Sequence, residues 1–294
     1  MHLKHIVFLV SLLSAFFFSV SICHAAENEG MLSPSSGNSD SIFGKASSEE
    51  FATDETLQSL LTQLQGKFPT DNGNWAVYIC DLFNESEGSL NSQSMQAASF
   101  IKLYIMGAIY ENYEAITQQY GKDSVDSNLY EMITISDNDA ANTLTSYLGG
   151  GDTTAGMQAV NSFCQAHGYQ DTHMGRLLLA SNEFDDNYTS VNDCGHFLRE
   201  VYAEEESSYE HASDMYALLK QQKLRNKIPA QLPEGVKTAS KTGELDDVEN
   251  DAAIIYDEEN DLILVFMSQN LSSTGSAQNT ISSLARNIYD YYNP

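Results

Sequence analysis

The sequence predicts an α/β fold of the α+β kind, in which an antiparallel sheet of about five strands is built from both ends of the chain. Helices flank this sheet, and an all-helical subdomain is inserted over about residues 115–225. Three observations predict the arrangement: buried-strand patterns near residue 75 and after residue 235, a block of helical patterns between them, and short turns between the late strands. Strands joined by such short turns are antiparallel neighbours.

The elements follow in order along the chain. Apolar spacing predicts a helix over 56–64, and an apolar run predicts a strand over 75–80, followed by a turn over 84–88. From residue 99 to about 113 the sequence is apolar on nearly every helical face, which is typical of a central buried helix. The predicted late elements are strands over 235–244, 250–256 and 262–269 and an amphipathic helix over 277–291. We expect a cleft where the sheet meets the helical subdomain.

The first residues have the pattern of an export signal. Lys4 precedes an apolar run over 6–18, and small residues follow it. This run is shorter than the about 20 residues that span a membrane. We therefore expect residues 1–25 to be a cleaved signal peptide, and the mature protein to be secreted or extracytoplasmic without stable membrane insertion. A lipid anchor on Cys23 is the alternative, although the bulky residue before Cys23 is unfavourable for it.

Residues 26–52 are rich in Ser, Glu, Gly and Asn and poor in apolar residues, so we expect a flexible linker there. The remaining residues, 53–294, are enough for one large core or two small subdomains. We expect them to form one monomeric domain that contains the helical subdomain.

Composition excludes several kinds of function. The chain carries 14 basic and 41 acidic residues, which gives a net charge of −27. The negative electrostatic field of such a chain repels nucleic acid and anionic membranes. The histidines have no metal-ligand spacing, so we expect no metal and no other cofactor. Cys80, Cys164 and Cys194 allow either one disulfide with a free thiol or three buried thiols.

The first chemical motif is Ser99-Phe100-Ile101-Lys102, the only S-x-x-K in the chain. A three-residue step puts both polar side chains on one face of a helix. A serine at a helix start lies at the positive end of the helix dipole, and a lysine in a dry cleft loses its proton more readily. Such a lysine can take the proton of the serine hydroxyl, so the pair is a candidate nucleophile and base.

Two further motifs follow. An S-D-N sequence at 136–138 precedes a predicted helix, where capping alone would account for it. A K-T-G sequence at 241–243 lies inside a predicted late strand, where a glycine often marks the close approach of another group. In this order and context, the three motifs resemble the set found in class A β-lactamases and penicillin-binding proteins.

The resemblance to class A β-lactamases extends beyond the motifs. It includes the residues around them, over 97–103, 133–142 and 240–245, and it covers residues 55–294. It implies the α+β fold predicted above and an acyl-enzyme mechanism. In that mechanism Ser99 attacks an amide carbonyl, with Lys102 as its general base or the relay to one. Ser136 passes a proton to the departing nitrogen, and Asn138 hydrogen-bonds the side-chain amide of the substrate.

The resemblance also gives the late strand a role in binding. Lys241 and Thr242 would receive the carboxylate of the substrate, and Gly243 lets the substrate lie along the strand edge. The backbone N–H groups of Ser99 and Glu244 would form the oxyanion hole. In so acidic a protein, a cleft with two lysines attracts an anionic substrate locally.

One position departs from the family. Class A β-lactamases carry a loop glutamate, in the pattern E-x-x-L-N, that drives water onto the acyl-enzyme. Here Arg176 and Asn182 match the arginine and asparagine of that loop, but Leu178 stands where the glutamate belongs. A leucine cannot accept a proton. We expect the acids that follow, at 183–186, to be solvated or to pair with Arg176, because a shifted acid rarely keeps a catalytic geometry.

These observations predict an exported active-site-serine acyl hydrolase that β-lactams acylate at Ser99 and that hydrolyses a β-lactam or a related amide. Its partner is then a small-molecule β-lactam or a peptidoglycan-type peptide. The alternatives are a DD-peptidase-like cell-wall hydrolase and a non-hydrolytic penicillin-binding sensor. Leu178 favours the sensor, whereas the lack of a transmembrane pattern in the sequence disfavours it. A lipase-type hydrolase would require G-x-S-x-G, which does not occur in the sequence.

Overall fold

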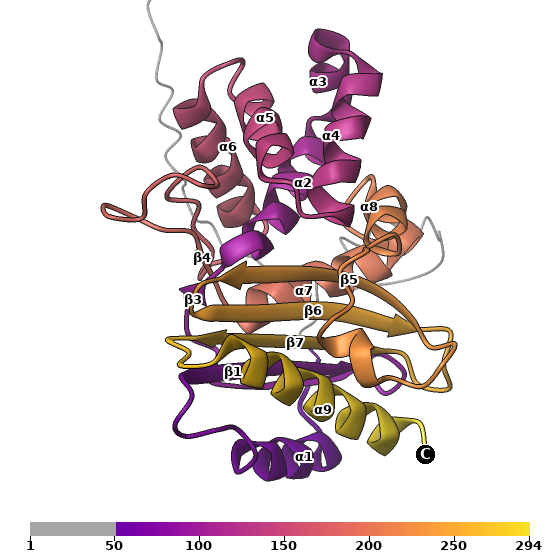
Figure 1. The fold of residues 1–294 in the computed structure, drawn as a ribbon. Helices are drawn as coiled ribbons and strands as arrows, with labels where there is room; N and C mark the ends of the chain where they lie inside the picture. The colour runs from indigo at the N-terminus through magenta and orange to yellow at the C-terminus, as the bar shows by residue number, and fades with distance from the viewer. Residues whose placement is uncertain (1–50) are drawn as a thin grey trace, which may run out of the picture. The chain divides into compact units, whose positions relative to one another are not determined.

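A computed structural model describes residues 51–294, so the predicted signal peptide and residues 26–50 of the predicted linker lie outside the described residues. The predicted antiparallel sheet of five strands is confirmed, and its order is β2-β1-β7-β6-β5 (Figure 1). Two strands come from the first part of the chain, β1 (Asn74–Asp81) and β2 (Ser86–Leu90). Three come from the last part, β5 (Lys237–Leu245), β6 (Val248–Tyr256) and β7 (Leu262–Gln269). The sheet is therefore assembled from both ends of the chain.

Strand β1 is apolar along most of its length because both faces of the sheet are covered. Ala76, Tyr78 and Cys80 belong to the core that the sheet shares with the helical region. The alternate residues at 75, 77 and 79 belong to a second core on the opposite face. Because successive side chains of a strand point to opposite faces, both sets must be apolar.

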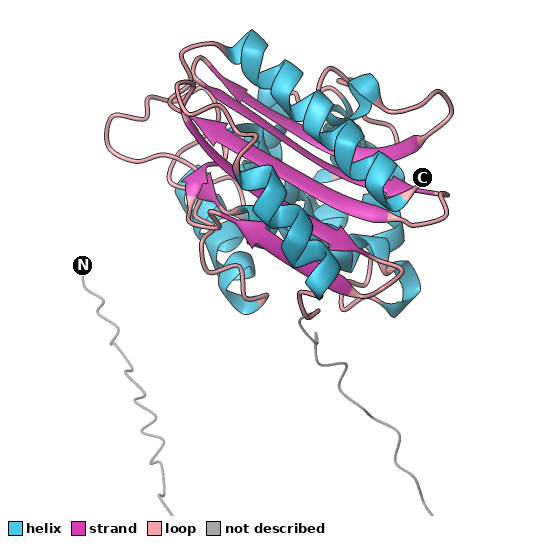
Figure 2. Cartoon of the chain, turned by 90° about the horizontal axis from the view of Figure 1, so that it is seen from below, coloured by secondary structure: helices cyan, strands magenta, loops and turns pink. Residues whose placement is uncertain are grey.

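Two terminal helices cover one face of the sheet, α1 (Glu55–Gln65) and α9 (Thr274–Tyr292), as Figure 2 shows. Helix α1 begins after Asp54, whose carboxylate accepts a hydrogen bond from the backbone N–H of Leu57 at 2.7 Å. This contact satisfies one of the amide groups that a helix start leaves without a partner. The sequence-predicted helices over 56–64 and 277–291 correspond to α1 and α9.

The helical region covers the other face (Figure 1). Helix α2 (Ile101–Glu111) is buried over residues 101–110, as expected for a central helix. The remaining helices of this region are α3 (Tyr113–Tyr120), α4 (Lys122–Thr134), α5 (Asn138–Leu148), α6 (Thr153–Ala166), α7 (Val191–Tyr202) and α8 (Ala212–Leu219). A long loop joins α6 to α7, and at its base the short strands β3 (Met95–Gln96) and β4 (Tyr188–Thr189) pair with each other.

Strand β2 is the main element that the sequence pattern did not predict. The turn expected over 84–88 occupies residues 82–85, and the chain then pairs with β1 as an edge strand. Its sequence, Ser-Glu-Gly-Ser-Leu, contains no β-branched or aromatic residue, so it lacks the usual strand signal. The Thr53 hydroxyl donates a hydrogen bond to the Glu87 carbonyl at 2.6 Å, which fixes the segment before α1 against β2.

The structure decides between the two alternatives for the cysteines. Cys80, Cys164 and Cys194 are buried free thiols. Within residues 51–294, no helix has the length and apolar character needed to cross a membrane. The same residues contain no group of three or more His, Cys, Asp or Glu side chains that could hold a metal ion.

Candidate active site

Ser99 lies at the start of the buried helix, in a short 3-10 turn, η1 (Ala98–Phe100), that runs directly into α2. Ala98 has a φ of 48°, in the left-handed region that residues other than glycine rarely adopt. Such strain costs about 1–3 kcal/mol and is common at functional sites, where the surrounding structure maintains it. The turn presents the half-buried Ser99 side chain to the cleft.

Lys102 is fully buried in the first turn of α2 and contacts two other predicted site residues besides Ser99. Its Nζ lies 3.1 Å from Ser99 Oγ and 3.2 Å from Ser136 Oγ. Two closer acceptors are the Ser136 carbonyl oxygen at 2.6 Å and Asn138 Oδ1 at 2.7 Å. A neutral amine has two N–H donors and one lone pair. With its donors directed to the two closer acceptors, Lys102 keeps the lone pair for the Ser99 hydroxyl.

The surroundings of Lys102 favour this neutral form. Burial lowers the pKa of Lys102 to about 7, although the carboxylate of Asp137 opposes the shift. Removing a cation from water is costly, so the neutral amine is favoured in a buried position. The lysine is therefore suited to accept a proton near neutral pH.

Ser136 and Asn138 flank the start of α5. Ser136 has a φ of 61°, and its hydroxyl also accepts a hydrogen bond from Lys241 Nζ at 2.8 Å. Asp137, between them, caps α5 by accepting a hydrogen bond from the backbone N–H of Ala140 at 2.7 Å. Helix capping thus explains Asp137, whereas the polar groups of its two neighbours are directed to the lysines.

Strand β5 brings the third motif to the same place. Lys241 is fully buried, and its Nζ donates to the Thr242 carbonyl at 2.8 Å as well as to Ser136. A Cβ atom on Gly243 would lie 3.0 Å from the Ala97 carbonyl oxygen and 3.3 Å from the Ser99 backbone nitrogen. A side chain here would push these neighbours apart by a few tenths of an ångström, so glycine favours the close approach of β5 to the Ser99 backbone. The contact thus places β5, which carries Glu244, beside the Ser99 backbone nitrogen, one of the two groups of the predicted oxyanion hole.

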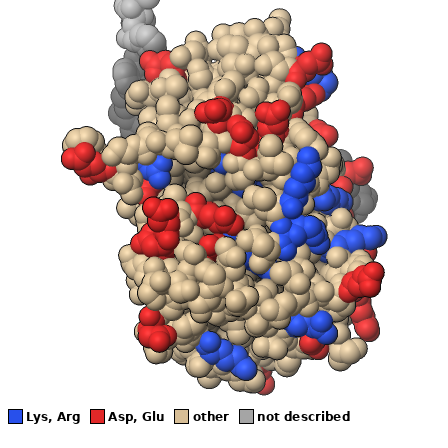
Figure 3. All heavy atoms as spheres, viewed as in Figure 1, with Lys and Arg blue, Asp and Glu red and all other residues tan. Residues whose placement is uncertain are grey.

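A pocket of about 320 Å³ opens beside Ser99. Its lining includes Asn138, Glu244 and the loop segment 178–182, which contains Asn182. The pocket is large enough for a small ligand. On the molecular face shown in Figure 3, basic side chains gather on the side of α8 and β5, and acidic side chains lie at several other places.

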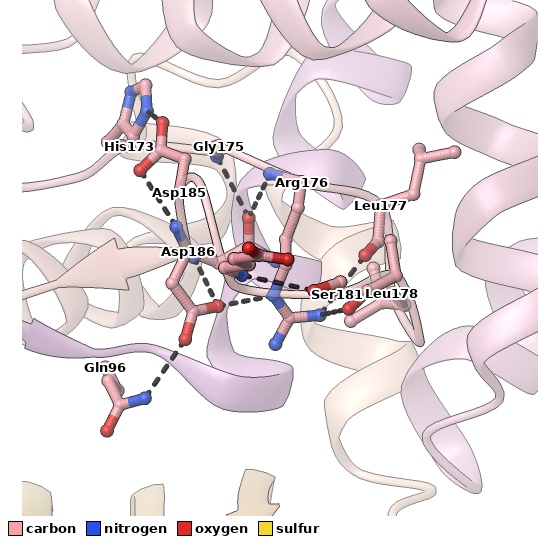
Figure 4. Close-up of polar contacts among 12 residues, drawn as sticks. Gln96, His173, Gly175, Arg176, Leu177, Leu178, Ser181, Asp185 and Asp186 are labelled. Atoms are coloured by element: carbon pink, nitrogen blue, oxygen red, sulfur yellow. Dashed lines mark hydrogen bonds and ion pairs between the residues drawn. The ribbon is translucent and has the colours of Figure 1, made fainter.

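The loop between α6 and α7 is held by polar contacts at its base (Figure 4). Arg176 Nε lies 2.6 Å from Asp186 Oδ1, and Asp186 Oδ2 accepts a hydrogen bond from Gln96 at 3.0 Å. Asp185 Oδ2 lies 2.8 Å from His173 Nε2. These two acids are therefore engaged in holding the loop. Glu183 is exposed and does not contribute to the pocket lining.

Leu178, which the sequence places where class A β-lactamases carry a glutamate, lies at the pocket. Its side chain is 7% exposed and lines the pocket with Ser99. The side-chain amide of Asn142, one turn after Asn138 on α5, contacts both the backbone N–H of Leu178 at 2.9 Å and its carbonyl oxygen at 3.0 Å. This pair of contacts fixes Leu178 against the site. Sequence reasoning missed the role of Asn142, although its helical spacing from Asn138 was the available signal.

Lys227 is the second residue that sequence reasoning missed. It is fully buried beside β5 and forms ion pairs with Glu244 and Glu249. No short motif marks it, because it precedes a 3-10 turn, η3 (Ile228–Gln231), rather than a regular helix or strand. Its charge lies next to the pocket-lining Glu244.

The pKa of Lys102 predicts a pH profile for acylation by a β-lactam. If neutral Lys102 takes the Ser99 proton, the rate should rise about tenfold per pH unit below pH 7 and level off above it. The sign follows because the protonated lysine, which predominates at low pH, cannot accept a proton. Stopped-flow acylation between pH 5 and 9 measures this profile. In Lys102→Ala, acylation should be slow and its rate should no longer rise with pH below pH 7. If the acylation rate of the unmutated protein does not change with pH through pH 7, Lys102 is not the general base.

Comparisons with known proteins show the family and the fold of the chain. The model of a family described as the beta-lactamase enzyme family matches residues 116–292. No curated protein matches the sequence significantly. Among solved structures, PBP-A is similar with a TM-score of 0.71 at 20% identity, over 82% of this chain and 98% of that chain. A beta-lactamase from Sphaerobacter thermophilus has a TM-score of 0.66 at 20% identity, over 79% of this chain and 96% of that chain.

A third structure is a leucine-to-glutamate mutant of PBP-A, an acyl-enzyme complex with penicillin G. It has a TM-score of 0.69 at 20% identity, over 80% of this chain and 97% of that chain. At this level of identity the similarity shows the fold, and it confirms the predicted fold class.

Proposed function

Since the chain belongs to the beta-lactamase enzyme family, we propose that it is an active-site-serine acyl hydrolase that β-lactams acylate at Ser99. The single observation that carries the proposal is the position of Lys102. Its buried Nζ lies 3.1 Å from Ser99 Oγ and 3.2 Å from Ser136 Oγ, between a nucleophile and a proton donor. The substrate class is a β-lactam or a related amide.

The geometry supports a sequence of proton transfers. Neutral Lys102 takes the hydroxyl proton of Ser99 while Oγ attacks the carbonyl carbon, and the N–H groups of Ser99 and Glu244 stabilise the oxyanion. As the C–N bond breaks, the Ser136 hydroxyl donates its proton to the departing nitrogen. Lys102 then returns a proton to Ser136 Oγ. Lys241 Nζ, which donates to the same oxygen at 2.8 Å, keeps the hydroxyl oriented.

A non-hydrolytic penicillin-binding protein is the second candidate, and Leu178 is the observation that favours it. A hydrolase needs a base that activates water against the ester of the acyl-enzyme. The described residues place a leucine side chain at that part of the pocket, and the neighbouring Asp185 and Asp186 bind other groups. We therefore expect acylation to be much faster than deacylation.

Intact-protein mass spectrometry with benzylpenicillin, followed over time, tests the proposal. We expect an adduct of the penicillin mass that forms within the mixing time and persists. An adduct that disappears with release of the hydrolysed penicillin would show a hydrolase of β-lactams and exclude the second candidate. A persistent adduct supports acylation at Ser99 and leaves hydrolysis to a related amide. Absence of any adduct at millimolar penicillin would contradict both.

Lys241 should determine how strongly a substrate carboxylate is attracted. Lys241→Ala should weaken transition-state stabilisation for acylation by benzylpenicillin by roughly 2–4 kcal/mol. Burial lowers the pKa of Lys241, but a bound carboxylate favours its ammonium form, and this contact is lost in the variant. The same change should affect the methyl ester of benzylpenicillin less, since that ligand has no free carboxylate. The ratio of the two acylation rate constants measures the effect. A ratio that is the same in the variant and the unmutated protein would remove this role from Lys241.

We also propose that the protein is exported. The support is the signal-like pattern of the first residues, Lys4 followed by the apolar run over 6–18. Edman sequencing of the protein secreted by its native host tests this proposal, with a mature terminus near residue 26 as the expected result.

A further inference from the structure

The face of β5 that carries Thr242 and Glu244 has an ionic arrangement that the motifs do not predict. Residues two apart on a strand share a face, so the Glu244 side chain lies on the same face as that of Thr242. Glu244 also lines the pocket with Ser99. A substrate group received by Thr242 therefore lies beside the Glu244 carboxylate.

The Glu244 carboxylate already has a cation. Lys227 Nζ donates to Glu244 Oε1 and to Glu249 Oε2, both at 2.8 Å. Glu249 lies directly opposite Glu244 on β6. The side chain of Glu249 is buried, whereas that of Glu244 is 46% exposed. Two carboxylates thus share one buried ammonium group, and the exposed one is at the pocket.

This charge balance is unfavourable for another carboxylate. Burial alone would raise the pKa of Glu244, but the charge and hydrogen bond of Lys227 more than offset it, so the pKa is lowered and the side chain is ionised. Asp251, opposite Thr242 on β6, is fully buried, and burial raises its pKa to about 7, so it adds little further negative charge. Lys241 Nζ donates to Ser136 Oγ and the Thr242 carbonyl, and burial lowers the pKa of this lysine. A substrate carboxylate could reach Lys227 only by displacing Glu244.

We propose that Glu244 is a specificity-determining residue that disfavours a free carboxylate beside the scissile amide and favours an uncharged or cationic group there. This inference rests on the proposed function of the same site. The preferred substrate is then an amide whose leaving part is amidated, linked to a further residue or amine-bearing. A peptide that ends in a free carboxylate at this position is a poorer substrate.

The test compares two ligands that differ by one charge, benzylpenicillin and its methyl ester. Their acylation rate constants are measured on the same protein preparation, so their ratio does not depend on the folded fraction. Glu244→Gln should raise the acid-to-ester ratio by about tenfold, because a competing carboxylate is removed and Lys227 gains freedom to attract the ligand. Lys241→Ala should move the same ratio in the opposite direction. Glu131→Gln makes the same change of charge at an exposed position of α4, and it should leave the acid-to-ester ratio unchanged.

Each outcome is decisive. A ratio that Glu244→Gln leaves unchanged overturns the inference, and so does an equal rise in Glu131→Gln, which would show only a long-range effect of net charge. Glu244→Ala, which removes the carboxylate without introducing an amide, should shift the ratio in the same direction as Glu244→Gln. If neither ligand forms an adduct with the unmutated protein, the proposed function itself fails, so the two failures are distinguishable.

Discussion

Ser99→Ala should abolish covalent labelling by a fluorescent penicillin while the protein stays folded. The Ser99 hydroxyl, the proposed nucleophile, lies 3.1 Å from Lys102 Nζ, and no other serine in the chain has a lysine three residues later. Packing of the core does not depend on the Ser99 hydroxyl, so removing this hydroxyl should leave the fold intact. Fluorescence of the denatured protein on a gel measures labelling, and circular dichroism measures folding.

A second serine in the same pocket provides the matched control. Ser181 also lines the pocket but has no neighbouring lysine, and its Oγ accepts a hydrogen bond from the backbone N–H of Glu183 at 3.2 Å. Ser181→Ala should therefore label at the unmutated rate. If Ser99→Ala labels as fast as the unmutated protein, the nucleophile has been assigned to the wrong residue.

Much of this site was predictable because its chemistry depends on short sequence steps. The three-residue step from Ser99 to Lys102 fixes both side chains on one helix face, and the contact at 3.1 Å agrees with it. The long-range part of the site has no such local rule. Ser136 lies 34 positions after Lys102 in the sequence, and its own backbone is in the left-handed region. Only the resemblance to a family predicted that these two side chains meet.

The residues that sequence reasoning missed share a physical feature. Lys227 is important because it is buried where it pairs with Glu244 of β5 and Glu249 of β6, since an exposed lysine next to a glutamate would contribute little. Asn142 matters because its side chain binds the backbone of a loop 36 positions away. Such contacts depend on the packed structure: helical spacing places Asn142 on the same face of α5 as Asn138, but it does not show which loop backbone the side chain binds. Strand β2 escaped prediction for a similar reason, because pairing with β1 outweighs its own weak strand propensity.

Leu178→Glu should shorten the lifetime of the benzylpenicillin acyl-enzyme. The unmutated protein offers no base at this position of the pocket, so its adduct should persist. A positioned general base is typically worth about 10²–10⁴-fold in rate, and the Asn142 contacts at 2.9 and 3.0 Å already fix the backbone of residue 178 beside Ser99. The decay of the adduct, followed by intact-protein mass spectrometry, measures the gain.

The gain should be smaller than a complete class A site would give. The Leu178 side chain is only 7% exposed, so a carboxylate there loses hydration, and burial of this kind raises the pKa of a carboxyl group. The deacylation rate of Leu178→Glu should therefore rise with pH over a higher range than an exposed glutamate would give.

Leu179→Glu is the matched control for this prediction, because it adds the same charge one position further along the loop. The Leu179 side chain is 74% exposed, so a carboxylate there should be solvated and leave the adduct lifetime unchanged. An equal shortening in both variants would show that added negative charge, rather than a positioned base, accelerates deacylation. Fast hydrolysis of benzylpenicillin by the unmutated protein would refute the missing-base interpretation. Of the acids of this loop, Glu183 would then be the one left to activate water, and Glu183→Gln should leave a trapped adduct.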